Sequence, residues 1–378
     1  MGGIASGDLS CSSRAEAVCR LRLSVDLGAA GKMCSLVDTL FAVQEEVGSD
    51  PAGVHPLTRR EGGVIGSAAN LSNPRGLAVR ASAPGSGQPS LLFVCDYDRD
   101  QVKVFDANSG EFIRSIGSGV EGLGEGHLSA PTDVVVRSLP SGQSQLYVSE
   151  VGNNCIQVFD ADSGTHIHML GVGKLDKPRG LALLENPVAS QLPTLLFVAS
   201  CEHPSVKVLN ADTGSLVRTI GAGTAGLDMG ELKLPIGVAV RKAPPGSASQ
   251  WLLYVSEFSN HRIQVFDADT GAHVCMIGAG VMGAGPGQLR CPWGIALQES
   301  APGSGAPCLL YVADYWNHRV QVFDADTGAY VRMIGTGKGS AVVQLQYPNN
   351  IVMHPGPDGK MLMFVSESAN NRVQVIEV

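Results

Sequence analysis

Short apolar runs recur along most of this chain, and polar or glycine-rich segments separate them. Each run is four to six residues long, is rich in Val, Leu, Ile and aromatic residues, and is bounded by Gly, Pro, Asn or Asp. Runs of this length and composition are typical of β-strands, because an amphipathic helix needs a longer stretch with a period near 3.6 residues. The pattern therefore predicts an all-β protein.

The predicted strands fall into a repeated unit. A Val-Phe-Asp segment or a close variant occurs six times, at spacings of 50 to 57 residues. Its central positions are Phe105, Phe159, Leu209, Phe266, Phe323 and Ile376. Ahead of each copy stand a proline that begins one apolar run and then a second apolar run. The prolines are Pro74, Pro131, Pro178, Pro235, Pro292 and Pro348. This fixed order at a regular spacing indicates one supersecondary unit per repeat.

Five of the units continue with a turn such as Ala-Asp-Thr-Gly and a fourth apolar run. Glycine supplies the positive φ that such turns need. Each unit is therefore expected to form a four-stranded antiparallel meander. One meander cannot bury both faces of its central strands, whereas six of them packed around an axis can. The sequence thus predicts a six-bladed β-propeller over residues 57–378.

The sixth unit ends at Val378, directly after its third strand. Natural sheets cover an edge of this kind, because an unpaired strand edge invites association. Residues 60–70 contain Val64-Ile65-Gly66, which is like the fourth strands of the other units. We expect this segment to complete the last blade. Residues 1–56 form an extension outside the repeat that is partly helical or disordered, and a short amphipathic helix is predicted over residues 35–47.

Two third-strand segments, Asn260-His261-Arg262 and Asn317-His318-Arg319, resemble the NHL repeat family, whose name records an Asn-His-Leu sequence at this place. The resemblance covers about residues 60–378 and departs at the third position, where this chain has arginine. It implies a propeller similar to the substrate-recognition end of RING and B-box ubiquitin ligases. Some family members bind RNA, and relatives of similar shape include metal-dependent lyases and lactonases. No Cys and His arrangement in this chain fits a RING, so a ligase role would require a separate subunit.

Candidate binding residues are sought where the units differ, because a residue present in every blade is expected to hold each blade together. The position after each proline is predicted to face the mouth of the central channel. It is occupied by Arg75, Thr132, Arg179, Ile236, Trp293 and Asn349. Nearby hairpin tips add Tyr97, Phe258, Tyr315 and Trp316. Arginine and aromatic residues dominate interface energetics, so this set is predicted to bind a protein partner. The alternative is that the aromatic residues pack against neighbouring loops.

Several repeated polar residues are predicted to be structural. An acidic residue ends the second strand in five units, and an arginine follows five residues later in three of them. These residues are expected to form ion pairs that stabilise the hairpin, and His261 and His318 belong to the same repeated segment. His166 and His168 could share one face of a strand and chelate a metal, but no third ligand accompanies them. We therefore predict neither a metal nor a cofactor.

Charge and motifs bear on the functional classes. From residue 71 onward the chain carries 21 Lys and Arg against 27 Asp and Glu. Nucleic-acid affinity rests largely on cationic contacts to phosphate, so this balance favours a protein partner over RNA. The channel-facing positions carry no catalytic constellation, and the chain is predicted not to be an enzyme. The sequence thus predicts a binding scaffold, with an RNA-binding propeller and a metal-dependent lyase or lactonase as alternatives.

Cysteine usage and hydropathy indicate a location. The nine cysteines are an odd number, and none of them forms a Cys-x-x-Cys pair. Such scattered cysteines favour a reduced intracellular compartment. A membrane-spanning helix requires about 18 or more predominantly apolar residues in a row, and no such run is present. We therefore expect a monomeric cytoplasmic propeller without membrane contact.

Overall fold

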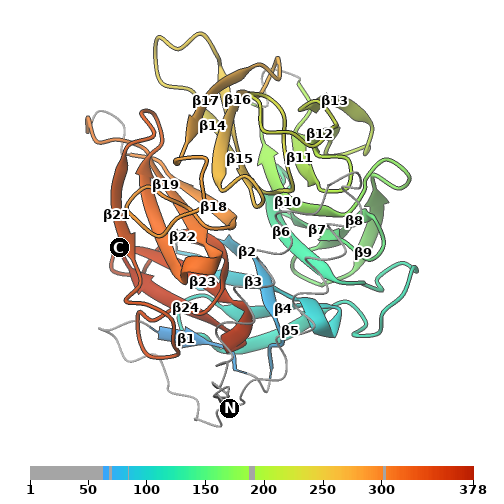
Figure 1. Cartoon of the computed structure of the whole chain (residues 1–378). Coiled ribbons are helices and arrows are strands. Elements are labelled where there is room, and N and C mark those ends of the chain that lie inside the picture. Colours follow the sequence, from blue (N-terminus) through green and yellow to red (C-terminus); the bar gives the residue numbers. More distant parts are fainter. Residues whose placement is uncertain (1–62, 68–69, 84, 187–191, 301–303) are drawn as a thin grey trace, which may run out of the picture.

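Six four-stranded antiparallel sheets surround a central axis in the computed structural model, which describes residues 63–67, 70–83, 85–186, 192–300 and 304–378 (Figure 1). The innermost strands of neighbouring sheets contact one another, and the remaining strands of each sheet follow toward the outside. The predicted six-bladed β-propeller is thereby confirmed. The helix predicted over residues 35–47, with the rest of the extension 1–56, lies outside the described residues.

The first three blades follow chain order. Blade 1 consists of β2 (Pro74–Arg80), β3 (Leu91–Asp96), β4 (Gln101–Asp106) and β5 (Phe112–Ile116). Blade 2 consists of β6 (Pro131–Ser138), β7 (Ser144–Glu150), β8 (Cys155–Asp160) and β9 (His166–Leu170). Blade 3 consists of β10 (Pro178–Leu184), β11 (Leu195–Ser200), β12 (Ser205–Asn210) and β13 (Leu216–Ile220).

The last three blades continue the ring. Blade 4 consists of β14 (Pro235–Lys242), β15 (Trp251–Glu257), β16 (Arg262–Asp267) and β17 (His273–Ile277). Blade 5 consists of β18 (Pro292–Gln298), β19 (Leu309–Asp314), β20 (Arg319–Asp324) and β21 (Tyr330–Ile334). Blade 6 consists of β22 (Pro348–Pro355), β23 (Met361–Glu367), β24 (Arg372–Glu377) and β1 (Gly63–Ile65). Short 3-10 turns occupy Tyr97–Arg99, Tyr315–Asn317 and Ser368–Asn370.

Strand β1 closes the ring as the outer strand of the last blade. It pairs antiparallel with β24, with Val64 opposite Gln374 and Ile65 opposite Val373. The Ile65 side chain is fully buried and packs with Leu71, Phe105 and Phe364 between blades 6 and 1. The closure predicted from the segment 60–70 is therefore confirmed for its described strand, Gly63–Ile65, and Figure 1 shows β1 beside β24. A segment ahead of the first blade thus covers the strand edge that Val378 would otherwise leave open.

The hydrophobic core is divided among the interfaces between blades. Six buried clusters occur among the described residues. Five of them join side chains of two neighbouring sheets, and the sixth joins blades 5 and 6 and also includes Ile236 of blade 4. The Phe of the repeated Val-Phe-Asp segment serves this packing, since Phe159 of blade 2 lies in the cluster that it shares with blade 1. Each blade is therefore stabilised by its neighbours on both sides.

Candidate functional site

The predicted channel-mouth residues converge near the axis from different blades. The Arg75 guanidinium of blade 1 lies 3.2 Å from the centre of the Tyr97 ring and 5.9 Å from that of Trp293 in blade 5. Arg179 of blade 3 approaches the same indole at 5.5 Å. These distances are those of cation–π contacts. The mouth is therefore occupied by a Trp ring with an arginine near it from each of two other blades.

Most of the ten predicted binding residues are buried. Arg75 and Arg179 are 0% exposed and Trp293 is 3% exposed. The other four buried members of the set are Thr132, Ile236, Asn349 and Tyr315. Tyr97, Phe258 and Trp316 are half-buried. The expected exposure is thus not found for seven side chains, because inner strands converge at the axis and their side chains cover one another. Partner contact by the ten residues remains a prediction.

An aromatic cluster forms one side of this face, between blades 4 and 6. Trp293 lies 5.5 Å from Phe258 and 5.3 Å from Tyr315, measured between ring centres. Tyr347, which the sequence analysis missed, lies 4.9 Å from Tyr315 and 5.4 Å from Trp316. Tyr347 directly precedes one of the repeated prolines, a position that also varies between units and could have been searched. The aromatic rings of this cluster thus pack mainly against one another, which is close to the alternative in which the aromatic residues pack against neighbouring loops.

One hydrogen bond joins blades 2 and 6, the two blades that flank blade 1. Four blades have glycine two residues after the repeated proline, and the other two have Asp133 and Asn350. The Asn350 side-chain amide donates to Asp133 Oδ1 at 2.8 Å, and the Leu181 amide donates to Oδ2 at 2.8 Å. Burial raises the pKa of Asp133 to about 7, although these hydrogen bonds lower it. A Cβ on Gly76 would lie 2.4 Å from Asp133 Cα, so the glycine permits close strand approach.

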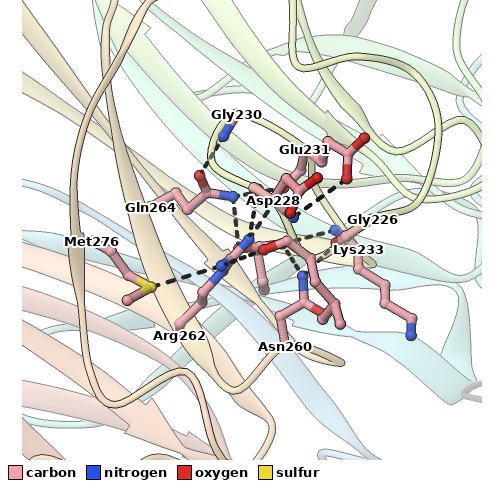
Figure 2. Close-up of polar contacts among 11 residues, drawn as sticks. Gly226, Asp228, Gly230, Glu231, Lys233, Asn260, Arg262, Gln264 and Met276 are labelled. Carbon is pink, nitrogen blue, oxygen red and sulfur yellow. Dashed lines mark hydrogen bonds and ion pairs between the residues drawn. The ribbon is translucent and has the colours of Figure 1, made fainter.

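A buried polar network holds the loop before blade 4 in place (Figure 2). Asn260 donates to the Gly226 carbonyl at 2.8 Å, and Arg262 Nη1 donates to the Leu227 carbonyl at 2.9 Å. Gln264 bonds the same loop twice, because its amide donates to the Glu231 carbonyl at 2.6 Å and its oxygen accepts the Gly230 amide at 2.9 Å. We call this set of Asn, Arg and Gln side chains a loop brace.

Equivalent braces occur in three further blades. The residues are Asn317, Arg319 and Gln321 in blade 5, Asn370, Arg372 and Gln374 in blade 6, and Asn153 with Gln157 in blade 2. Blade 2 has Cys155 at the arginine position. Each brace fixes the loop that leads into its own blade, at residues 117–130, 221–234, 278–291 and 335–347. The repeated third-strand segment that carries the family resemblance therefore holds the interblade loops in place.

A buried carboxylate lies behind each arginine of these braces. Arg262 Nε donates to Glu257 at 2.5 Å, Arg319 Nε to Asp314 at 2.8 Å and Arg372 Nε to Glu367 at 2.7 Å. The predicted acid and arginine pairs are thus confirmed. Burial raises the pKa of Glu257 even though Arg262 lowers it. In blade 2, where Cys155 stands in place of the brace arginine, burial raises the pKa of Glu150 to about 7.

Apolar side chains on the loops between blades point into solvent. Leu123 is 81% exposed, Leu227 is 69% exposed and Met229 is 76% exposed. Further exposed members of the set are Val120, Val172, Val281, Met282 and Val342. All eight lie on the face that also carries the channel mouth, because each loop ends at the first residue of an inner strand. Ordered loops that expose large apolar side chains are the feature of this face that the sequence analysis did not find.

A second repeated contact joins successive blades. His261 Nδ1 accepts the Cys291 amide at 3.1 Å, and His318 Nδ1 accepts the Tyr347 amide at 3.1 Å. Asn154 and Asn371 accept the corresponding amides in other blades at 2.8 Å. His261 has a positive φ of 55°, a conformation that asparagine also tolerates. These contacts support the structural role predicted for His261 and His318.

The His261 contact should make stability depend on pH. Burial, followed by repulsion from Arg290 and Lys233, lowers the pKa of His261 to about 4. The unfolded chain, with a histidine pKa near 6.5, therefore binds the proton more readily than the folded protein does. The stability that neutral His261 contributes is complete above pH 6.5 and is lost as the pH falls toward 4. We expect His261→Asn, which keeps the acceptor, to remove about 2–3 kcal/mol of this loss. Urea unfolding of both proteins from pH 7.5 to 4 measures this loss. A difference in the free energy of unfolding between the two proteins that does not change with pH would contradict the prediction.

The described residues hold no group of three or more His, Cys, Asp or Glu side chains that could bind a metal ion. His166 and His168 lie on β9, where the His166 ring packs edge-on against Phe159 at 5.6 Å. Cys95, Cys155, Cys275 and Cys308 are free thiols. Among the same residues, no helix has the length and apolar character needed to cross a membrane. The cytoplasmic location remains a prediction.

Comparison with known proteins places the chain near NHL-repeat propellers. No protein-family model matches it. It is 24% identical over 322 residues to NHL repeat-containing protein 2 of Bos taurus and 24% identical over 326 residues to that of Homo sapiens. Each alignment covers 72% of this chain, and the chain spans 41% of the length of these curated relatives. Sequence similarity and fold are together consistent with an NHL-repeat propeller.

Solved structures share the architecture at low sequence identity. An auxiliary nutrient binding protein from Bacteroides ovatus superposes with a TM-score of 0.55 at 16% identity, covering 86% of this chain and 75% of that one. A protein of the same description from Bacteroides thetaiotaomicron gives a TM-score of 0.52 at 14% identity, covering 81% and 69%. At these identities the similarity concerns the fold alone.

Proposed function

We propose that this chain, a propeller of the NHL-repeat type, is a non-catalytic scaffold that binds a protein partner through the face formed by its interblade loops. The observation that carries the proposal is the set of exposed apolar side chains on braced loops, with Leu123, Leu227 and Met229 the most exposed. Large apolar side chains in solvent are commonly part of interaction sites when they gather on one face. A cytoplasmic ubiquitin-ligase adaptor is one form of this function, and it rests on the family resemblance.

Rigidity of the loops adds to the proposal. A mobile loop loses conformational entropy when it binds, and this loss lowers affinity. The loop over residues 221–234 is instead held by hydrogen bonds to Asn260, Arg262 and Gln264 before any partner arrives. The half-buried Tyr97, Phe258 and Trp316 lie nearer the axis on the same face and offer further contact area. Rigid loops on a rigid ring can therefore present a fixed surface.

RNA binding is less well supported than protein binding. Phosphate binding needs accessible cations, but Arg75 and Arg179 of the channel mouth and Arg262 of the brace are all buried. A buried guanidinium cannot exchange counterions for a phosphate without rearrangement of the mouth. Enzymatic activity also lacks support, because Asp133, the acidic residue among the inner-strand positions near the mouth, is buried and engaged in hydrogen bonds with Leu181 and Asn350.

Site-specific photo-crosslinking tests the proposal. A photoreactive residue is placed at Leu227 in one protein and at Val331, an exposed position on β21, in a control. We expect defined polypeptide adducts in a native cell extract from the Leu227 position and none from Val331, with no effect of ribonuclease. Adducts of equal yield from both positions, or adducts that ribonuclease removes, would contradict a protein-binding loop face.

A further inference from the structure

Two of the interblade loops combine exposed apolar side chains with exposed carboxylates. Residues 117–130 carry Val120, Leu123, Glu121 and Glu125, and all four are exposed. Residues 221–234 carry exposed Leu227, Asp228 and Met229 in succession. We name these segments the acidic loops. No lysine or arginine lies within residues 117–130, and residues 221–234 contain one, Lys233, which is half-buried.

The carboxylates of the acidic loops differ in their hydrogen bonding. Glu231 accepts the Asp228 amide at 3.3 Å and Glu121 accepts the Ser129 hydroxyl at 2.9 Å, so these two stabilise their own loops. The side chain of Glu125 is 82% exposed, and its Oε2 lies 4.0 Å from His166 Nδ1. Asp228 lies between the two exposed apolar side chains of its loop. Each acidic loop thus presents at least one carboxylate to solvent beside a large aliphatic or thioether side chain.

We propose that the acidic loops bind polypeptide segments in which apolar residues alternate with lysine or arginine. This inference rests on the proposed function and specifies its partner class. Apolar contact would supply affinity, while complementary charge selects a basic segment over an acidic one and repels phosphate. The brace side chains hydrogen-bond the backbone of residues 226–231 (Figure 2), so the loop needs no ordering on binding.

Two other interblade loops expose apolar side chains without the carboxylates. The loop over residues 278–291 exposes Val281 and Met282 but carries no carboxylate, and residues 335–347 carry the exposed Lys338 beside Val342. Selection for basic segments is therefore expected from the two acidic loops alone. Both lie on the same face and lead into blades 2 and 4, so one extended partner could contact them together, with the avidity that linked sites provide.

Three labelled synthetic peptides test the inference by fluorescence anisotropy with the full chain. They are four-fold repeats of Gly-Leu-Lys, Gly-Leu-Glu and Gly-Ser-Lys, and a 15-nucleotide oligouridine serves as the RNA probe. We expect Gly-Leu-Lys to bind at least ten-fold more tightly than either other peptide and than the RNA. The reversed-charge protein Glu125→Lys with Asp228→Lys should prefer Gly-Leu-Glu instead.

A second variant separates specific contact from general stickiness. The triple substitution Leu123→Ser, Leu227→Ser and Met229→Ser should weaken Gly-Leu-Lys binding at least ten-fold. The control, Val274→Ser on β17 with Val331→Ser on β21, removes exposed apolar side chains from outer strands away from the loops and should leave binding unchanged. Thermal melts of all variants should coincide, since none of these side chains is buried.

The outcomes are distinguishable. Binding of Gly-Leu-Lys that neither loop variant changes, or no binding of any peptide, overturns the inference, while the crosslinking test of the proposed function is unaffected. Equal binding of the Lys and Glu peptides, lost in the triple variant, overturns the charge selection and leaves an apolar protein-binding face. Preferential binding of oligouridine overturns both.

Discussion

Replacing Ile65 by aspartate should lower the free energy of unfolding by about 4 kcal/mol or more. The Ile65 side chain is fully buried between blades 6 and 1, and its removal alone costs about 2–5 kcal/mol. A carboxylate at that place would also be desolvated without a partner. The loss concerns the whole ring, because β1 supplies the outer strand of the last blade. Denaturant unfolding followed by circular dichroism measures it.

The control for this experiment is Val331→Asp in β21, another outer strand. Val331 is exposed, so its replacement should change the free energy of unfolding by about 0.5 kcal/mol or less. If Ile65→Asp proves as mild as Val331→Asp, then β1 does not close the propeller in solution. A large decrease in the free energy of unfolding in both proteins would instead mean that outer strands in general do not tolerate a charge.

Replacing Arg262 by alanine should cost about 3–5 kcal/mol, because it leaves the fully buried Glu257 without its cation. The same change removes the hydrogen bonds from Arg262 to the Leu227 and Asp228 carbonyls. Lysine should not restore stability, since one ammonium cannot reach Glu257 and two loop carbonyls in the geometry of a guanidinium. Urea unfolding at pH 7.5 gives the magnitude.

Two further proteins identify the cause of that loss. Arg332→Ala removes an exposed arginine from β21 and should cost about 0.5 kcal/mol or less. Adding Glu257→Gln to Arg262→Ala removes the buried charge and should recover at least about 1 kcal/mol. A double variant less stable than Arg262→Ala would show that the loop hydrogen bonds, and not the unpaired carboxylate, dominate.

Much of the architecture could be predicted because its signals are local. Strand lengths, the six repeated units and the outer strand around Val64 and Ile65 follow from apolar runs, turn glycines and the edge left at Val378, and the structure confirms them. The pairs of Arg262 with Glu257 and Arg319 with Asp314 were predictable for the same reason, since each joins residues five apart across one hairpin.

The binding face could be predicted only in part, because burial near the axis depends on side chains from other blades. Arg75 and Trp293 lie in different units, and nothing in either unit alone indicates that the two side chains meet. Asp133 and Asn350 are 217 residues apart in the chain, and their hydrogen bond joins blades 2 and 6. The ordered, exposed position of Leu227 could not be predicted from its Gly-rich segment. The brace that holds this segment, from Asn260 to Gln264, follows more than thirty residues later in the chain.

Amide hydrogen exchange tests most directly the central claim that the interblade loops are held rigid by the braces. The informative amides are those of Gly126, Gly230, Gly287 and Val343, each of which donates to the side-chain oxygen of a brace glutamine at 2.7–2.9 Å. The account predicts slow exchange at all four, with Gln264→Ala releasing Gly230 and leaving the other three protected. Exchange of Gly230 at the rate of an unstructured peptide in the unmodified protein would contradict it.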